Sequence, residues 1–364
     1  MASMQTDPAP AAVPPGFERL RVKAVIRETA DAHSIVFEVP DDRADRFAYA
    51  PGQFLTLRVD VDGETCLRCY SLASSPSVDA DLKVSIKRVA GGRVSNRLLD
   101  TVQAGDDLVV MPPKGVFRLR ESAAPVVLFA AGSGITPVIS ILKQILVTTA
   151  RPVTLVYANR DERSVIFRHE LAGLAARHAD RFTLVHRFDD REGPLTADAV
   201  AARTGVAEAQ FYMCGPAPFM QMVRNSLREA GIAEERIFLE SFDGEIDETP
   251  AAPAATGAEA AGEDAAARVV VRHHGADHAF GVRAGETVHA AAARQGLNLP
   301  FSCKAGYCGL CLARVTSGTV TMKDNLGGVS DAQIAEGWTL ACQAQVTSPE
   351  ATLVKVSRRW SRPA

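Results

Sequence analysis

Four cysteines near the C-terminal end of the chain constrain its fold most strongly. Cys303, Cys308 and Cys311 are separated by four and two residues, and Cys342 follows after 30 more. One loop brings the first three thiolates together, while the fourth comes from a distant segment. This arrangement supplies two protein ligands to each iron of a 2Fe-2S cluster. The pattern therefore predicts a compact iron–sulfur domain around these residues.

A zinc site is the alternative interpretation of the same cysteines. Structural zinc normally uses closely spaced pairs of cysteines, and Cys342 has no second cysteine nearby. The spacing therefore favours the iron–sulfur cluster over zinc. Gly306 and Gly309 would let the loop curl and direct backbone N–H groups toward the cluster sulfurs.

The composition excludes several classes of protein. The 364 residues are 47% hydrophobic and 23% charged, as in globular proteins, and the length suits two or three domains. A net charge of -3 gives no general attraction to nucleic acid, so we expect no nucleic-acid partner. The longest apolar stretch, residues 125–142, is interrupted by Gly132-Ser133-Gly134 and Pro137. We expect no membrane span and a cytoplasmic location.

Residues 243–267 mark the clearest boundary. They contain ten alanines and no aromatic residue, which predicts a flexible linker. Residues 1–16 are rich in alanine and proline and lack the features of a secretory signal, so we expect a disordered leader. The expected domains are residues 17–121, 122–242 and 268–364.

The three expected domains differ in their patterns. Short β-rich runs between turns predict an antiparallel β-barrel in the first, at 20–26, 34–39, 54–59, 82–89 and 108–110. Strands alternating with helical patterns predict an α/β parallel sheet in the second. The strands are expected at 126–131, 153–158, 182–186, 210–214 and 236–239, separated by helical segments such as 137–146 and 217–230. Elements at 268–272, 280–282, 287–294, 315–320 and 340–346 predict a small α+β module.

A glycine-rich turn connects the first strand of the second domain to its helix. In Gly132-Ser133-Gly134-Ile135-Thr136-Pro137, the glycines allow a pyrophosphate to approach, Thr136 is expected to cap the helix, and Pro137 suits its first turn. The third glycine of the GxGxxG pattern is absent, so an ordinary packing loop is the alternative.

Two further segments belong to the same expected crevice. Cys214-Gly215-Pro216 ends the fourth strand, where α/β sheets bind ligands, although a single buried cysteine is often only packing. Residues 159–164 follow the second strand. An acidic residue there would accept from a ribose 2′-hydroxyl, whereas Arg160, Arg163 and Ser164 would hold a 2′-phosphate. A solvated turn is the alternative for Asp161 and Glu162.

The order of these motifs resembles a known family. Three further motifs occur along with the glycine-rich turn, the Cys214 motif and the four cysteines. They are Arg68-Cys69-Tyr70-Ser71, Gly92-Arg93-Val94-Ser95-Asn96 and Glu240-Ser241-Phe242. Residues 17–357 are thus similar to the ferredoxin–NADP reductase superfamily with a C-terminal plant-type ferredoxin domain, which implies a β-grasp fold there. The resemblance is to reductase components of oxygenases, of the 3-ketosteroid 9α-hydroxylase and phenylacetyl-CoA epoxidase type.

The resemblance implies roles for individual residues. Arg68 would hold the flavin phosphates, Tyr70 would stack on the isoalloxazine ring, and Ser71 would lie near flavin N5. Cys214 would lie where nicotinamide C4 meets the flavin. Lys87, Gly92, Val94 and Ser95 would line the flavin's diphosphate and ribityl part, Phe242 would cover its ring, and Gly132, Gly134, Thr136, Arg160, Gly215 and Pro216 would bind the nicotinamide dinucleotide.

The resemblance also implies an electron path. NADH, favoured over NADPH, would reduce FAD, and the 2Fe-2S cluster would pass electrons to a separate oxygenase, hydroxylase or desaturase. FAD is favoured over FMN, which phthalate dioxygenase reductases use with the same domain order. A redox-sensing module that binds NAD(H) without sustained turnover is the alternative function.

Overall fold

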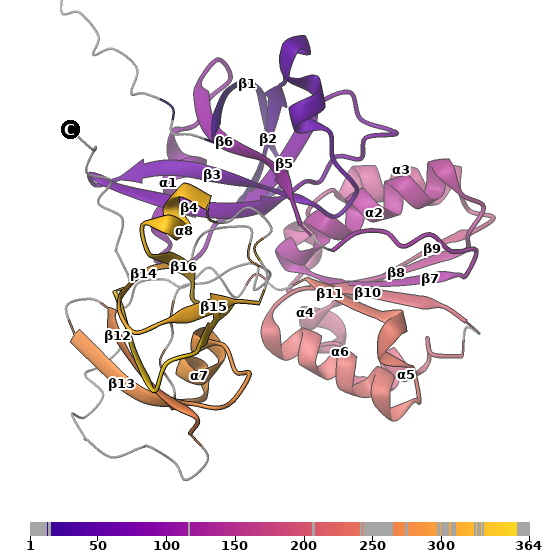
Figure 1. The fold of residues 1–364 in the computed structure, drawn as a ribbon. Coiled ribbons are helices and arrows are strands. Elements are labelled where there is room, and N and C mark those ends of the chain that lie inside the picture. The colour runs from indigo at the N-terminus through magenta and orange to yellow at the C-terminus, as the bar shows by residue number, and fades with distance from the viewer. Residues whose placement is uncertain are drawn as a thin grey trace, which may run out of the picture.

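The computed structural model of this protein folds into three units along the described part of the chain (Figure 1). Cys303 and Cys308, most of the predicted leader, and the predicted linker up to residue 264 lie outside the described residues. The described residues are 13, 16–115, 117–205, 208–240, 242, 265–273, 276–295, 297, 299, 306, 311–323, 325, 329 and 331–354.

The N-terminal unit is an antiparallel barrel, as the sequence predicts. Its strands pair in the order β4-β3-β6-β1-β2-β5, and the edge strands β4 and β5 meet through a bridge between Leu72 and Val84. The Ala73 amide reinforces this closure by donating to the Lys83 carbonyl at 2.7 Å. The elements are β1 (Glu18–Arg27), β2 (Ala32–Glu38), η1 (Asp41–Phe47), β3 (Phe54–Val61), β4 (Glu64–Ser71), β5 (Leu82–Lys87), α1 (Arg93–Thr101) and β6 (Asp107–Lys114).

The strand expected at 108–110 is longer than predicted, because β6 continues to Lys114 through two prolines. Proline cannot donate to a ladder, so it is tolerated where pairing is irregular. Pro112 and Pro113 lie where the register between β3 and β6 shifts, between the Met111–Thr56 and Lys114–Phe54 pairs. The two prolines therefore made the end of β6 unpredictable from the sequence, although its pairing with β3 keeps it a strand.

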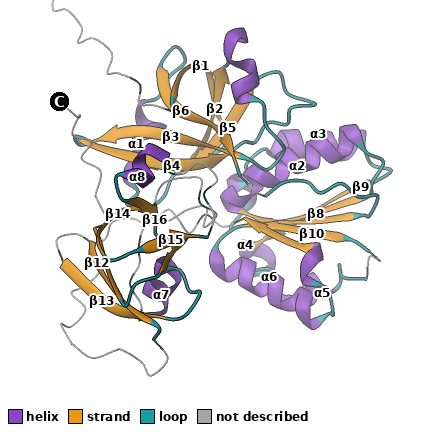
Figure 2. Cartoon of the chain, viewed as in Figure 1, coloured by secondary structure: helices purple, strands orange, loops and turns teal. Residues whose placement is uncertain are grey.

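The central unit is a parallel sheet in the order β11-β10-β7-β8-β9. Helices α2 and α3 cover one face and α5 and α6 the other (Figure 2), so the inner strands are apolar on both sides. Only the segments that form α2 and α6 have helix ranges predicted from the sequence. The elements are β7 (Val126–Ala131), η2 (Gly132–Gly134), α2 (Ile135–Thr148), β8 (Val153–Asn159), η3 (Glu162–Ser164), α3 (Arg168–Arg177), β9 (Phe182–Phe188), α4 (Asp189–Glu192), α5 (Ala197–Ala201), β10 (Gln210–Cys214), α6 (Ala217–Glu229), η4 (Glu234–Arg236) and β11 (Ile237–Glu240).

The barrel and the parallel sheet share a hydrophobic core. Ala32, Ala73 and Phe117 of the N-terminal unit pack within the cluster that lies under α2 and α3. The ring of Phe117 meets that of Tyr212, on β10, edge-on at 5.8 Å between centroids. This shared apolar contact holds the two units against each other.

The C-terminal unit has the expected α+β arrangement. Its main sheet has the order β13-β12-β18-β14-β16, a short ladder joins β15 and β17, and α7 packs into the same core. The elements are β12 (Ala267–His273), β13 (Ala276–Val282), α7 (Val288–Arg294), β14 (Leu312–Ser317), β15 (Val320–Met322), α8 (Asp331–Ala335), β16 (Trp338–Leu340), β17 (Ala344–Val346) and β18 (Glu350–Val354).

Two of the elements expected in this unit are each divided by a turn. The segment 315–320 turns at Gly318, whose φ of 75° lies in the left-handed region that favours glycine. The segment 340–346 is broken after Leu340 by a turn that contains Cys342.

None of the helices among the described residues is both long and apolar enough to cross a membrane.

Candidate functional site

The glycine-rich turn lies at the carboxyl end of β7, as the sequence predicts. Gly132 has a φ of 52°, and the turn leads directly into α2. The N-cap of α2 is Gly134, so the expectation that Thr136 caps the helix is wrong. Thr136 lies inside the helix, and its hydroxyl donates to the Ser133 carbonyl at 3.0 Å. The turn runs directly into α2, because the Ile135 amide donates to the Gly132 and Ser133 carbonyls. A helix N-terminus that follows such a turn is suited to bind a phosphate.

The Cys214 motif lies beside this turn, because β10 pairs with β7. A Cβ on Gly134 would overlap the Cys214 carbonyl and lie 2.7 Å from the Gly215 amide nitrogen. A Cβ on Gly215 would lie 2.8 Å from the Phe219 ring. Both positions therefore need glycine. Cys214 is 0% exposed and belongs to the core under α2, and Pro216 is the N-cap of α6.

The proposed flavin residues of the barrel lie near its closure. Tyr70 and Ser71 are buried at the end of β4, and Arg68 lies on the same strand. Gly92 is the N-cap of α1, whose first turn contains the buried residues Val94 and Ser95.

Gly92 allows the first turn of α1 to pack closely. A Cβ there would lie 2.7 Å from the Ser95 hydroxyl and 2.9 Å from the Val89 Cβ. The Ser95 hydroxyl also accepts from the Val89 amide at 3.3 Å. The amides at the start of α1 thus form a second helix N-terminus suited to an anion.

Lys87 connects the two halves of the candidate site. It ends β5 in the barrel, yet its Nζ would lie 3.6 Å from a Cβ placed on Gly132 of the parallel sheet unit. Asp31 accepts from the Arg160 guanidinium at 3.1 Å and lies 4.0 Å from Lys87 Nζ. Burial lowers the pKa of Lys87, and the Asp31 carboxylate opposes that shift. Lys87 therefore lies beside the glycine-rich turn, and the Asp31 carboxylate links it to Arg160.

The charged turn after β8 is built by local contacts. Asp161 caps η3 by accepting from the Ser164 amide at 2.9 Å. Glu162 accepts from Arg191 at 2.7 Å and also pairs with Arg168, and these cations lower the pKa of Glu162. Neither acidic side chain is simply a solvated charge. Phe242, after β11, packs against the core under α2.

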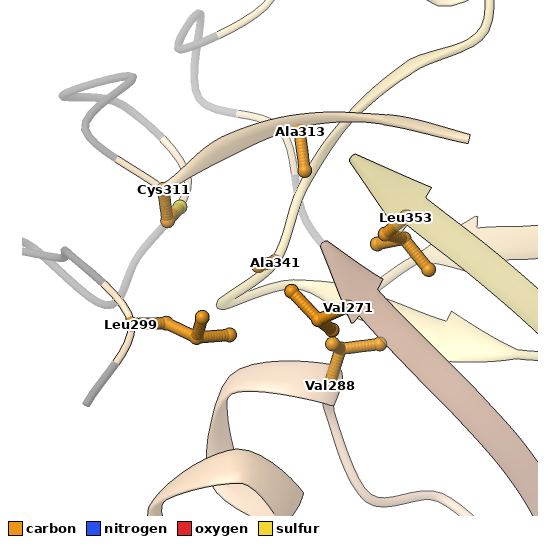
Figure 3. A pocket seen from close by; sticks show the side chains of 7 residues that line it. All are labelled: Val271, Val288, Leu299, Cys311, Ala313, Ala341 and Leu353. Atoms are coloured by element: carbon orange, nitrogen blue, oxygen red, sulfur yellow. The ribbon is translucent and has the colours of Figure 1, made fainter. Parts of the chain in front are cut away.

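Two of the four predicted cluster ligands are described, and they lie together. The Sγ atoms of Cys311 and Cys342 are 3.2 Å apart, well beyond a disulfide bond of about 2.0 Å. The Ala341 amide donates to the Cys311 carbonyl at 3.0 Å and fixes the two loops together. Cys311 lines a small apolar pocket together with other residues (Figure 3), among them Val271, Val288, Leu299 and Leu353. Two adjacent buried sulfurs fit a thiolate-bound iron–sulfur cluster.

The chain matches three families of domains. Residues 19–119 match the oxidoreductase FAD-binding domain, residues 128–225 the oxidoreductase NAD-binding domain, and residues 271–347 the 2Fe-2S iron-sulfur cluster binding domain. The ferredoxin reductase component of 3-ketosteroid-9-alpha-monooxygenase from Rhodococcus rhodochrous is 44% identical to the chain, over 90% of this chain and 93% of that protein. The chain belongs to the ferredoxin reductase superfamily. The family and the domain types expected from the sequence are confirmed.

Other relatives of the chain are named as parts of different oxygenase systems. The glycine betaine monooxygenase reductase subunit of Pseudomonas aeruginosa is 37% identical over 90% of this chain and 92% of that protein. One component of the 1,2-phenylacetyl-CoA epoxidase from Escherichia coli is 33% identical over 90% of this chain and 94% of that protein. The solved phthalate dioxygenase reductase shares the fold, with a TM-score of 0.57 and 24% identity over 93% of this chain and 98% of that one.

Asp31 could not be recognised from the sequence as a residue of this site. This residue lies in the turn between β1 and β2, and 129 positions separate it from Arg160. An aspartate in a turn is ordinary, so no local signal marks it. Only the packing of the barrel against the NAD-binding domain brings Asp31 to both cations.

Proposed function

We propose that this reductase oxidises NADH and passes the electrons through FAD and a 2Fe-2S cluster to a partner oxygenase, hydroxylase or desaturase. The observation that carries the proposal is the convergence of Lys87, from the FAD-binding domain, on the Gly132 turn of the NAD-binding domain. This contact brings the FAD-binding and NAD-binding domains together at the glycine-rich turn. When bound, FAD accepts electrons in pairs and releases them singly, as a one-electron cluster requires.

The dinucleotide would lie across the glycine-rich turn. Gly132, Gly134 and the start of α2 would hold its pyrophosphate, and Arg160 would bind it beside the ribose 2′-position. Lys87, expected at the flavin's diphosphate and ribityl part, has its Nζ beside Gly132 and would lie between the two cofactors. Asp31 would orient both cations. Cys214, Gly215 and Pro216 would form the adjacent edge of the crevice at the end of β10.

The flavin would lie along the barrel closure. Tyr70 and Ser71 would contact its ring system, and Arg68 with the N-terminus of α1 would hold its phosphates. Phe242 would cover the ring. FAD is the flavin that the matched domain family binds, which supports it over FMN.

The four cysteines would hold the cluster. Cys311 and Cys342 supply adjacent sulfurs, and Cys303 and Cys308 would complete the set. Gly306 has a φ of 76°, so it allows the loop between these ligands to turn tightly.

The ion pairs made by the charged turn after β8 support NADH over NADPH. Arg160 is paired with Asp31, and Arg168 and Arg191 are paired with Glu162. A cation that is already neutralised attracts a 2′-phosphate less strongly. The partner's organic substrate would be bound by the oxygenase, and the cytoplasmic location stays a prediction.

The proposal is tested with the full-length chain reconstituted with flavin, iron and sulfide. NADH should bleach the flavin in stopped flow, give an EPR signal from the reduced cluster, and sustain many turnovers with an artificial one-electron acceptor. NADPH should react more slowly. Cys342→Ser should lose the cluster signal while keeping flavin reduction. Reduction of little more than one equivalent would instead support the redox-sensing module, and stoichiometric zinc without an EPR signal would exclude the cluster.

A further inference from the structure

A buried lysine lies at the interface between the FAD-binding and NAD-binding domains. Lys143, on α2, has a side chain that is only 2% exposed, and its Nζ lies 2.9 Å from Asp79 and 2.8 Å from Glu170. Lys83 Nζ lies 3.1 Å from the other oxygen of Glu170. Asp79 and Lys83 belong to the FAD-binding domain, whereas Lys143 and Glu170 belong to the NAD-binding domain. We call these four residues the interdomain charge cluster.

The interdomain charge cluster is balanced, with two ammonium groups and two carboxylates. A buried charge is strongly unfavourable without its partner, so each member depends on the others. Burial by itself would raise the pKa of Glu170, but the charges of Lys143 and Lys83 outweigh it and hold that pKa below its usual value. Glu170 is therefore ionised at neutral pH, and the bridge to Lys83 spans the two domains.

Neutral hydrogen bonds tie the same two segments together. The Ser140 hydroxyl on α2 donates to the Ser74 carbonyl at 2.6 Å. The Ser75 hydroxyl donates to Gln144 on the next turn of α2 at 2.8 Å. The Asp79 carboxylate accepts from the Ser75 amide at 2.7 Å, which orders the loop that carries it. Residues 72–79 are thus fastened to α2 along two turns of the helix.

The two fastened segments begin at the two proposed cofactor sites. Residues 72–79 follow directly after Tyr70 and Ser71 at the end of β4, and α2 follows directly after the Gly132 turn. Lys143 lies about two helical turns from the start of α2. A shift of Lys143 relative to Asp79 would therefore move the glycine-rich turn relative to the end of β4.

We infer that Lys143 is a positioning residue that, through Asp79 and Glu170, fixes the glycine-rich turn against the flavin end of the barrel. This inference rests on the proposed function. Hydride transfer between two bound rings is sensitive to their separation, and a misplacement of about 1 Å can cost about 100-fold in rate. The interdomain charge cluster makes the two domains one rigid unit, so the nicotinamide meets the flavin without a domain closure.

The test compares three variants of the full-length reductase. Lys143→Met removes the charge and keeps much of the side-chain length. Glu170→Gln keeps the shape of a side chain that is 29% exposed, so it guards against loss of folding in the lysine variant. Lys23→Met is the matched control, because Lys23 pairs with Asp81 at 2.7 Å within the FAD-binding domain alone.

We expect Lys143→Met and Glu170→Gln to lower the limiting rate of flavin reduction by about 10- to 100-fold per bound flavin. The apparent Kd for NADH and the FAD content should stay within about threefold of wild type, since neither residue belongs to the proposed cofactor sites. A second readout needs no turnover: NAD+ added to the dithionite-reduced protein should give the long-wavelength absorbance of stacked nicotinamide and flavin in wild type and Lys23→Met, and much less in the other two.

The outcomes separate the inference from the function on which it rests. Unchanged reduction rate and unchanged absorbance in both cluster variants would overturn the inference. So would a loss confined to FAD content or melting temperature, with a normal rate per bound flavin, because that would be a purely stabilising role. A wild-type chain whose flavin is not reduced by NADH would refute the proposed function instead.

Discussion

Gly134 lies directly against the backbone of Cys214, so close that a Cβ on the glycine would overlap the Cys214 carbonyl group. The contact joins the carboxyl ends of β7 and β10, which are hydrogen-bonded neighbours in the parallel sheet. Because backbone meets backbone there, neither side can yield as a flexible side chain would. The geometry of the nucleotide crevice therefore depends on the absence of one methyl group.

Gly134→Ala should separate the two loops and impair the site. We expect overpacking to cost about 1–3 kcal/mol of unfolding free energy, and NADH-driven flavin reduction to fall sharply. Gly205→Ala is the control, because a Cβ there meets no atom within 4 Å. Thermal unfolding and stopped-flow reduction check both effects. A Gly134→Ala protein with wild-type stability and rate would contradict the close contact.

Cys214→Ala distinguishes the two interpretations of this cysteine. If the residue aligns the nicotinamide against the flavin, the reduction rate per bound flavin should fall about tenfold while flavin content is unchanged. If its burial in the core only serves packing, melting temperature should fall and the rate should not. Cys66→Ala, at a partly buried cysteine that packs against the barrel core, is the control for the loss of a cysteine sulfur.

Asp31→Asn should shift the coenzyme preference toward NADPH. The variant removes the carboxylate that neutralises Arg160, whose side chain is 67% exposed, and leaves Lys87 with less opposing charge. An exposed ion pair contributes up to about 1 kcal/mol, so the ratio of kcat/KM for NADPH over NADH should rise by up to about fivefold. Asp277→Asn breaks a similar pair with Arg272 in the 2Fe-2S domain and should leave the ratio unchanged. An unaltered kcat/KM ratio in Asp31→Asn would show that the 2′-phosphate of NADPH does not bind near Arg160.

Because of Glu170, the stability of the two nucleotide domains should fall at acidic pH. Its folded-state pKa is below the ordinary 4.5, so its ion pairs contribute fully above that pH and are lost as the pH falls through the folded value. Melting of wild type and Glu170→Gln, followed by flavin fluorescence, should differ most at neutral pH and converge below pH 4.5. Glu234→Gln alters an exposed carboxylate and should show a smaller difference. A difference in melting temperature between wild type and Glu170→Gln that does not change with pH would contradict a stabilising role for the ionised Glu170.

A chain that ends at Phe242 tests the predicted linker and the place of the cluster. It keeps both nucleotide domains, so we expect it to retain FAD and its reduction by NADH. It should lose electron delivery to the oxygenase. Adding residues 268–364 as a separate protein should restore turnover only at high concentration, because a tether holds its partner at about millimolar effective concentration. Full activity from the truncated chain alone would take the cluster off the electron path.

Much of the fold and the site could be predicted because the signals are local. The strand at 126–131 needs apolar residues on both faces, and the glycine-rich turn after it needs backbone freedom at Gly132. Both requirements are written in consecutive residues. The spacing of Cys303, Cys308 and Cys311 is equally local, and it predicts a metal centre before any packing is known.

Contacts between distant segments could not be read in this way. Pro112 and Pro113 argue against a strand, yet β6 continues through them because β3 offers a partner with a shifted register. The turn at Cys342 interrupts a run that looks like one strand, and that turn brings its sulfur to Cys311. In both cases tertiary pairing overrides a local preference.

The sequence by itself determined the family, the order of the domains and the residue types that each cofactor requires. Only the tertiary structure decided that Asp31 meets Arg160 and that Lys143 meets Asp79 across the domain interface. An isolated lysine or aspartate has no local pattern, because its value to the protein depends on the charge placed opposite it. That charge comes from packing two separately coded domains together, and burial then makes the pairing between them obligatory.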